Sequence, residues 1–217
     1  IEDKILIKPI NNEIQKFSDW KIQATSTNQD FSLIRQDSNL LTGCVTFYNL
    51  EFSNVSISSD GMKCEDAVNI VSSTGSIDKI NISNSKFDGL DIDFSEINIK
   101  NLNIVNSDND CADFSSGSYT IDNANLSNCN DKGISIGENS EISGLVFDIK
   151  SSYIGIAVKD SSLVQLGTLN STEVQYCVAA YRKKQEFAGS VLNIENFKCD
   201  EYNKSFIQDG SVLNVRN

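Results

Sequence analysis

The chain repeats a pattern with a period of 22 residues through six successive units. Stepping by 22 from Val68 or from Ile70 meets an apolar residue every time, and one residue separates the two columns. The first column contains Val68, Leu90, Ala112, Ile134, Ile156 and Val178. The second contains Ile70, Ile92, Phe114, Ile136, Val158 and Ala180. Such alternation is typical of a strand with one buried face, and a strand repeated at a fixed period must stack on its neighbours to bury that face.

A second strand is expected ahead of each of these strands. Its inward columns contain Ile80, Leu102 and Ala124, and then Ile82, Ile104 and Leu126. The outward column between them contains Asn81, Asn103 and Asn125, and a turn column after them contains Asn84, Asn106 and Asn128. Asparagine tolerates left-handed backbone, and its side chain can bond to an asparagine above or below it. Both asparagine columns therefore predict hydrogen-bonded ladders.

These columns predict an all-β fold, a single-stranded parallel β-helix of about eight to nine coils with about 22 residues in each. A leucine-rich repeat has a similar length, but its leucine frame and helical return are not found in the sequence. Residues 1–40 are expected to form irregular coils of the same solenoid, with a strand-like run at 31–34, and residues 41–217 to form regular coils. Because the chain begins at Ile1 and stops inside a strand-like run, we expect a fragment of a larger protein, with exposed ends that favour end-to-end self-association.

Charge and composition argue against several classes of function. Thirty acidic residues against eighteen basic ones give a net charge of −12, which disfavours nucleic acid as a partner. Histidine is absent, which excludes histidine metal sites and Ser-His-Asp catalysis. No apolar run is long enough to cross a bilayer, so no membrane span is expected in this segment.

The six cysteines form no Cys-x-x-Cys pair, so a zinc site is not expected. Cys177 and Cys199 lie one period apart, and Cys44 and Cys64 nearly so. Residues one period apart stack on adjacent rungs about 4.8 Å apart, within reach of a disulfide. Two interpretations stay open for all six, including Cys111 and Cys129: disulfides between rungs, or small buried thiols.

Acidic side chains recur in two neighbouring columns outside the core. The turn column that precedes the strand contains Asp66, Asp88, Asp110 and Lys132. The column between the two apolar columns is expected to face outward and contains Asn69, Asp91, Asp113 and Ser135. Because the rungs stack, these residues predict an acidic strip along three coils that passes into Lys132, Lys159 and Tyr181 on later coils.

The strip admits two interpretations. In the first it is a polysaccharide-processing groove, in which carboxylates hold calcium. The calcium candidates are Asp66, Asp88, Asp91, Asp110 and Asp113. Lys132 or Lys159 would neutralise a uronate, and Tyr181 or a lysine would move the proton, which makes these three residues the catalytic candidates. In the second interpretation the strip is a solvated face without a metal, because exposed carboxylates one rung apart repel by only about 1 kcal/mol in water.

A loop rich in cations is predicted to follow Tyr181. Its candidate substrate-binding residues are Arg182, Lys183, Lys184 and Phe187, to which Asp91 and Asp113 of the strip are added. Aromatic rings stack on sugars, and cations pair with acidic groups. The alternative is that Phe187 packs down on the coil while the cations are solvated.

Five local segments give the chain a family resemblance. They are Cys64–Ile70, Asn109–Ser115, Asp131–Glu138, Ile154–Asp160 and Ala179–Phe187. On these segments, and over roughly residues 40–217, the chain resembles the right-handed parallel β-helices of the pectate-lyase-like superfold. More narrowly, it resembles bacterial surface-associated β-helix modules, some of which lie beside CotH-type domains. The resemblance implies a right-handed coil and an extracellular or cell-surface location, but no particular activity, because fold does not determine function.

The leading expectation is a non-catalytic module of an exported or cell-surface bacterial protein. Its expected partners are a polysaccharide or an envelope protein, and flanking domains of the same chain. An enzyme needs a groove with loops on both walls, whereas one long insertion is found, at residues 182–189. Two alternatives stay open: a polysaccharide lyase or epimerase that acts on acidic glycans, and a structural spacer or assembly module.

Overall fold

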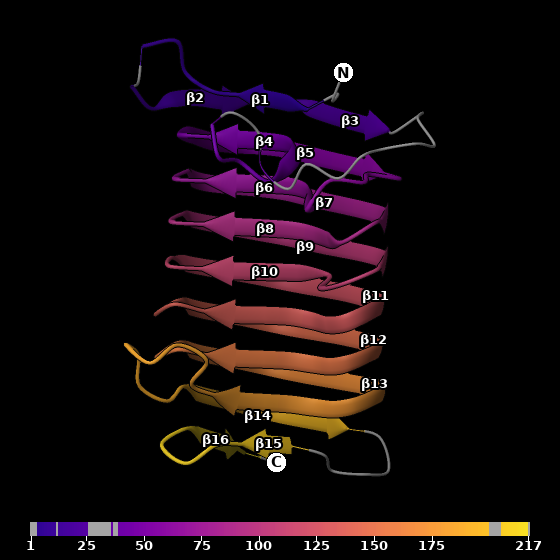
Figure 1. Ribbon diagram of the computed structural model, residues 1–217, viewed down its shortest axis with the longest axis vertical. Coiled ribbons are helices and arrows are strands. Elements are labelled where there is room, and N and C mark those ends of the chain that lie inside the picture. Colours follow the sequence, from indigo (N-terminus) through magenta and orange to yellow (C-terminus); the bar gives the residue numbers. More distant parts are fainter. Residues whose placement is uncertain (1–3, 12, 26–35, 37–38, 200–204, 217) are drawn as a thin grey trace.

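The computed structural model describes residues 4–11, 13–25, 36, 39–199 and 205–216, and these form a parallel β-solenoid (Figure 1). The described residues contain strands and no helix, so they include no helix that could span a bilayer. The chain winds in the right-handed sense for about eight turns, with about 22 residues in each coil. The predicted all-β parallel β-helix is confirmed.

Two rows of strands make up the coils. The row at the front of Figure 1 contains β1 (Ile5–Ile7), β4 (Gly43–Tyr48), β6 (Asp66–Val71), β8 (Asp88–Asp93), β10 (Ala112–Ser115) and β15 (Ser205–Ile207). The row behind contains β2 (Gln15–Ser18), β3 (Lys21–Thr25), β5 (Leu50–Asp60), β7 (Thr74–Ser85), β9 (Glu96–Ser107), β14 (Val191–Cys199) and β16 (Val212–Val215). Three long strands bend around the coil and join both rows: β11 (Ser118–Gly137), β12 (Glu141–Lys159) and β13 (Leu163–Tyr181). Each rung pairs in parallel with the next, so equivalent residues of successive coils lie side by side.

The pairing register follows the sequence period. Val68 pairs with Leu90, and Leu90 pairs with Ala112, all of them fully buried. Ser118, in contrast, pairs with Glu141, so this coil contains one residue more than the period. The additional residue lies in the corner that follows β11, where two residues have left-handed backbone, with φ of 56° and 61°.

The first coil is built from short strands. β1 pairs with β4, and β2 and β3 pair with β5. The strand-like run expected at 31–34 lies outside the described residues.

Both predicted asparagine ladders are present. Asn103 donates from Nδ2 to Asn81 Oδ1 at 3.0 Å, and Asn125 donates to Asn103 at 3.2 Å. The turn column repeats this pattern at 2.9 Å in both steps, and its residues have φ of 56°, 62° and 56°. The first ladder runs along the outward side of the strands, and the second satisfies side chains where the backbone turns.

A buried serine closes the corner after most of the front strands, a feature that we did not predict. Ser95 Oγ donates to the carbonyl two residues before it at 2.7 Å and accepts the N–H of Ser73 at 3.0 Å. One coil later the equivalent residue is Gly117, and the hydroxyl of Tyr119 donates to the carbonyl two residues before the glycine, at 2.9 Å. A Cβ on Gly117 would lie 2.3 Å from that hydroxyl. The glycine therefore makes room for a tyrosine that replaces the serine.

Three disulfides connect adjacent coils. They are Cys44–Cys64, Cys111–Cys129 and Cys177–Cys199, and no described cysteine is free. The disulfide interpretation is confirmed for the two pairs that the spacing indicated. The pair with a separation of 18 residues was not predicted, because that separation is shorter than the period.

Replacing Tyr119 by phenylalanine is expected to lower the free energy of unfolding by about 1 kcal/mol, because the corner loses a buried hydrogen bond. Urea denaturation measures the difference. Tyr153→Phe is the matched control, since Tyr153 is 51% exposed. Equal stability of the two variants would contradict the role assigned to the Tyr119 hydroxyl.

Candidate functional site

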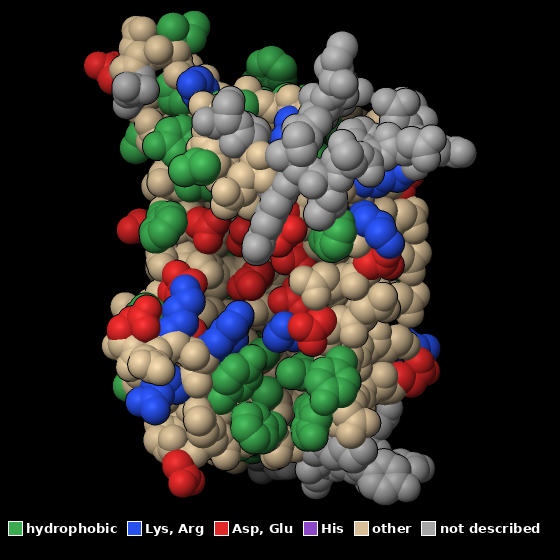
Figure 2. All heavy atoms as spheres, in the orientation of Figure 1, with side chains coloured by type: hydrophobic (Ala, Val, Ile, Leu, Met, Phe, Trp, Pro, Cys, Tyr) green, Lys and Arg blue, Asp and Glu red, His purple; other side chains and the backbone are tan. Residues whose placement is uncertain are grey.

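The predicted acidic strip lies on the outer side of β6, β8 and β10, where Figure 2 shows acidic side chains gathered near the centre of the face. Asp66 pairs in register with Asp88, and Asp91 with Asp113. We define the acidic cluster as Asp66, Asp88, Asp91, Asp93, Asp110 and Asp113. Stacking thus brings together the aspartates that we predicted to bind metal and substrate.

Two aspartates of the acidic cluster are buried and the other four are partly exposed. Asp66 is 2% exposed and Asp110 is 4% exposed. Asn69 and Ser135, which lie in the outward column, are also buried, at 1% and 0%. The strip is therefore less solvated than a fully exposed face would be, although Asp88, Asp91, Asp93 and Asp113 stay partly exposed.

Burial raises the pKa of five aspartates in this cluster: Asp66, Asp88, Asp91, Asp93 and Asp110. Desolvation is the largest cause in every case, and repulsion by neighbouring aspartates adds to it. The pKa of Asp66 rises to about 8, that of Asp88 to about 7, and those of Asp93 and Asp110 to about 6. The pKa of Asp91 is raised well above its ordinary value, and Asp66 is the neighbour that contributes most. At neutral pH Asp66 therefore holds its proton, and Asp88 is close to half protonated.

Lys132 neutralises one end of the acidic cluster. Its ammonium lies 3.1 Å from Asp110 Oδ1 and also pairs with Asp131. Although burial lowers the pKa of Lys132, the two carboxylates raise it above its ordinary value. Lys132 therefore stays protonated, which suits a partner for an anion better than a general base.

Lys159 covers the next part of the same column. Its ammonium lies 2.6 Å from Ser135 Oγ and 3.9 Å from Asp113 Oδ2, and its side chain is 7% exposed. The side chain passes over Gly137, where an added Cβ would lie 3.4 Å from its Cε. Ser135 is buried because the Lys159 side chain lies over it.

Tyr181 lies further along the same face, with its ring centroid 6.0 Å from that of Phe206. Burial raises the pKa of its hydroxyl, which disfavours a role as base. The structure therefore places the three catalytic candidates on one face, but the two lysines are already engaged with side chains of the chain itself.

The cationic loop is anchored by Asp160, a residue that we did not single out. Its buried Oδ1 accepts the N–H groups of Lys183 at 2.6 Å and Lys184 at 2.8 Å. The Lys184 ammonium pairs with Glu138, while Arg182 is exposed. Phe187 is half-buried, as expected if its ring packs down on the coil.

The described residues contain no formed calcium site. Within the residues that the structure describes, no group of three or more acidic, histidine or cysteine side chains is placed to hold a metal ion. The aspartates stack one rung apart in columns instead of converging on one point.

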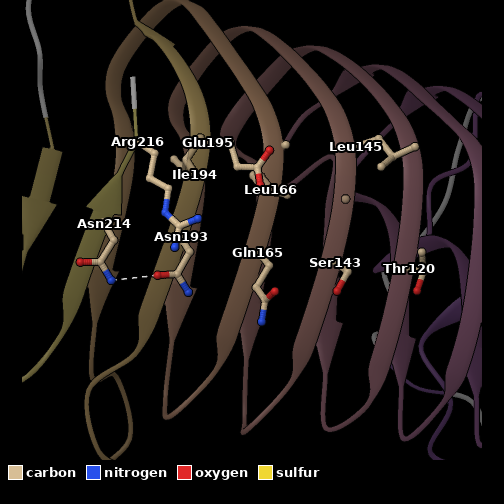
Figure 3. Close-up of a pocket in the computed structure, with 12 residues that line it drawn as sticks. Thr120, Ser143, Leu145, Gln165, Leu166, Asn193, Ile194, Glu195, Asn214 and Arg216 are labelled. Carbon is tan, nitrogen blue, oxygen red and sulfur yellow. Dashed lines mark hydrogen bonds between the residues drawn. The ribbon is translucent and has the colours of Figure 1, made fainter.

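An open groove of about 740 Å³ lies on a second face, formed by the segments that begin β11, β12 and β13 and by β14 and β16 (Figure 3). We did not predict it. An outward column runs along it from coil to coil: Thr120, Ser143, Gln165, Asn193 and Asn214. Leu145, 61% exposed, adds an apolar surface, and Glu195 and Arg216 add one charge of each sign.

The side chains of this column are short, uncharged and hydrogen-bonding. Asn214 donates from Nδ2 to Asn193 Oδ1 at 2.8 Å, the hydrogen bond drawn as a dashed line in Figure 3. The column could have been found in the sequence by stepping from Thr120, allowing for the additional residue before Glu141, the insertion at residues 182–189 and a last step of 21 residues. Its chemistry suits a ligand with many hydroxyl groups.

No protein-family model, no curated protein and no solved structure matches this chain.

Raised pKa values in the acidic cluster are expected to make the protein less stable as pH increases from about 5 to about 8. Between the ordinary value of 3.8 and the folded values of about 7 for Asp88 and about 8 for Asp66, the folded chain holds more protons than the unfolded chain. The free energy of unfolding therefore falls as pH rises, by about 1.4 kcal/mol for each pKa unit of a single group.

Urea denaturation at pH 5, 6, 7 and 8 measures this slope. Asp88→Asn is expected to flatten it, and Asp209→Asn, which removes an exposed carboxylate, to leave it unchanged. A free energy of unfolding that increases between pH 5 and pH 8 would contradict the burial of the cluster.

Proposed function

We propose that this protein is a non-catalytic polysaccharide-binding module, and that the groove of Figure 3 holds an extended stretch of the glycan. The observation that carries the proposal is the open groove itself. Its polar column continues across five coils in the direction of the solenoid axis, so it offers the same kind of contact at each rung. A polymer whose units repeat is the ligand class that such a surface suits.

The chemistry of the groove supports a sugar ligand. Amide and hydroxyl side chains donate and accept hydrogen bonds, and sugar hydroxyls do the same. Leu145 provides an apolar patch for the carbon face of a ring. With one acidic and one basic side chain in the lining, the groove favours a glycan without dense charge.

An exported or cell-surface location belongs to the same proposal. Disulfides persist in oxidising compartments, and three connect the coils of this protein. The kinship with bacterial surface-associated β-helix modules of the pectate-lyase-like superfold is likewise proposed, on the parallel β-helix and the sequence segments that suggested it. An envelope protein is the alternative partner for the same groove.

The alternative of a polysaccharide lyase has less support. Lys132 is held protonated by two carboxylates, and Lys159 is buried against Ser135 and Asp113. A lyase needs a base that can lose its proton near the substrate. Ultraviolet detection of unsaturated uronates from alginate and pectin tests this alternative, and product that disappears in Lys132→Ala protein would overturn the non-catalytic module.

The groove is tested by affinity electrophoresis and calorimetry against a panel of neutral and uronic-acid polysaccharides. The double variant Gln165→Ala, Asn193→Ala is expected to bind at least about tenfold more weakly, which corresponds to about 1.4 kcal/mol. Asn123→Ala, which removes an exposed amide outside the groove, is the matched control and is expected to bind normally. Equal binding by all three proteins, or no binding by the parent protein to any member of the panel, would overturn the proposal.

A further inference from the structure

The groove of Figure 3 runs between two rows of outward side chains. The first row is the neutral column from Thr120 to Asn214, and the second lies two residues further along each strand, about 6.6 Å away. Leu166 and Ile194, whose side chains are buried, lie between the rows. On successive coils the second row contains Asp78, Lys100, Asp122, Leu145, Gly167, Glu195 and Arg216, of which the last four line the groove. The groove therefore has one wall of neutral polar side chains and a second wall of different chemistry.

Leu145 and Gly167 interrupt the charges of the second row. They occupy the same position on adjacent coils, because the residues before them pair with each other and so do the residues after them. Leu145 is 61% exposed, which makes it the one large apolar side chain on this wall. Gly167 has no side chain, so the wall has an opening at its rung.

Close backbone packing explains why the residue at the opening is glycine. A Cβ on Gly167 would lie 2.8 Å from the carbonyl oxygen of Leu145. From the other side, Asn196 Nδ2 donates to the carbonyl of Gly167 at 3.2 Å. The side chains that flank the opening, those of Leu145 and Glu195, lie two rungs apart, about 9.6 Å. The opening between them is one rung wide, which suits the thickness of a single sugar ring.

We propose that this opening admits a branch of the bound polysaccharide, so that the ligand is a glycan with single-sugar side groups on its main chain. The proposal rests on the proposed function, because it takes the main chain to lie in the groove of Figure 3. The main chain follows the space between the two rows. It does not follow the second row itself, since the exposed side chains of Leu145, Glu195 and Arg216 occupy that row on both sides of Gly167. A sugar in the opening therefore lies beside the main chain, which is the position of a branch.

The two rims of the opening suit a neutral sugar. On one rim, the methyl groups of Leu145 offer an apolar surface to the carbon face of a ring. On the other, the Glu195 carboxylate accepts hydrogen bonds from hydroxyl groups, and within the described residues it forms no ion pair with a lysine or arginine. The positive charge of Arg216 follows on the next coil, so this part of the wall has no net charge that would favour an ionic branch.

Calorimetric titration with matched pairs of neutral oligosaccharides tests the opening. The pairs are mannopentaose with its galactosylated form, cellotetraose with the xyloglucan heptasaccharide, and xylotetraose with its arabinosylated form. The members of each pair share a main chain and differ by single-sugar branches. We expect the branched member of at least one pair to bind at least about tenfold more tightly than its linear partner.

Variants of the opening separate the branch from the main chain. Gly167→Ser is expected to abolish the preference for the branched member, because its side chain fills the opening, and to leave binding of the linear member unchanged. Because a Cβ here crowds the Leu145 carbonyl, Leu145→Ala is the second variant. It shortens an exposed side chain and is expected to reduce the preference at least about threefold. Phe94→Ala, which removes a side chain of nearly equal exposure, 62%, outside the groove, is expected to keep the full preference.

Equal binding of the branched and linear members of every pair would overturn the proposal and leave the groove as a site for a linear chain. A preference that both variants retain would also overturn it, because the branch would then be recognised elsewhere. If the parent protein binds no member of any pair, the branch proposal fails, and the polysaccharide panel decides the proposed function separately.

Discussion

Backbone pairing between successive coils is the interaction on which the rest of this structure depends. A single coil buries little, but in the stack Val68, Leu90 and Ala112 lie side by side and lose all contact with water. The same pairing acts on every outward residue, because a position on one rung always meets the equivalent position on the next. The asparagine ladders use this constraint to satisfy their amides, and the aspartates are forced together by it.

The stacking of equivalent residues has different consequences on the groove face and on the acidic face. On the groove face, side chains such as Gln165 and Asn193 are neutral, so stacking them costs little and leaves a surface open to a ligand. On the acidic face, stacking brings carboxyl groups together where water has little access. Desolvation is the largest cause of the raised pKa values of Asp66 and Asp88, and repulsion by neighbouring aspartates adds to it. The first arrangement favours recognition by hydrogen bonds, and the second makes stability depend on pH.

The architecture could be predicted because apolar columns such as Val68 to Val178 recur at a fixed spacing, and this spacing can be recognised in the sequence without knowing the fold. The sequence also located the aspartates correctly on one face. It did not show that Asp110 is buried, because burial there involves the long side chain of Lys132, which reaches across one rung to pair with it. The groove was missed for a different reason: the additional residue before Glu141, the insertion at residues 182–189 and a last step of 21 residues move its polar column out of the period. The role of Tyr119 was missed because its hydroxyl replaces the corner serine of other coils, although the residue at the serine position is Gly117, two residues earlier.

Gly137 has no side chain, yet it influences the electrostatics of residues on other coils. Lys159 passes over it to place an ammonium beside Ser135 and Asp113. A Cβ here would already touch Lys159, so a side chain longer than that of alanine would crowd it and displace the ammonium from the partly exposed Asp113 toward water. The charge balance of a solenoid face therefore depends on where its smallest residues fall, as well as on how many acids and bases the face contains.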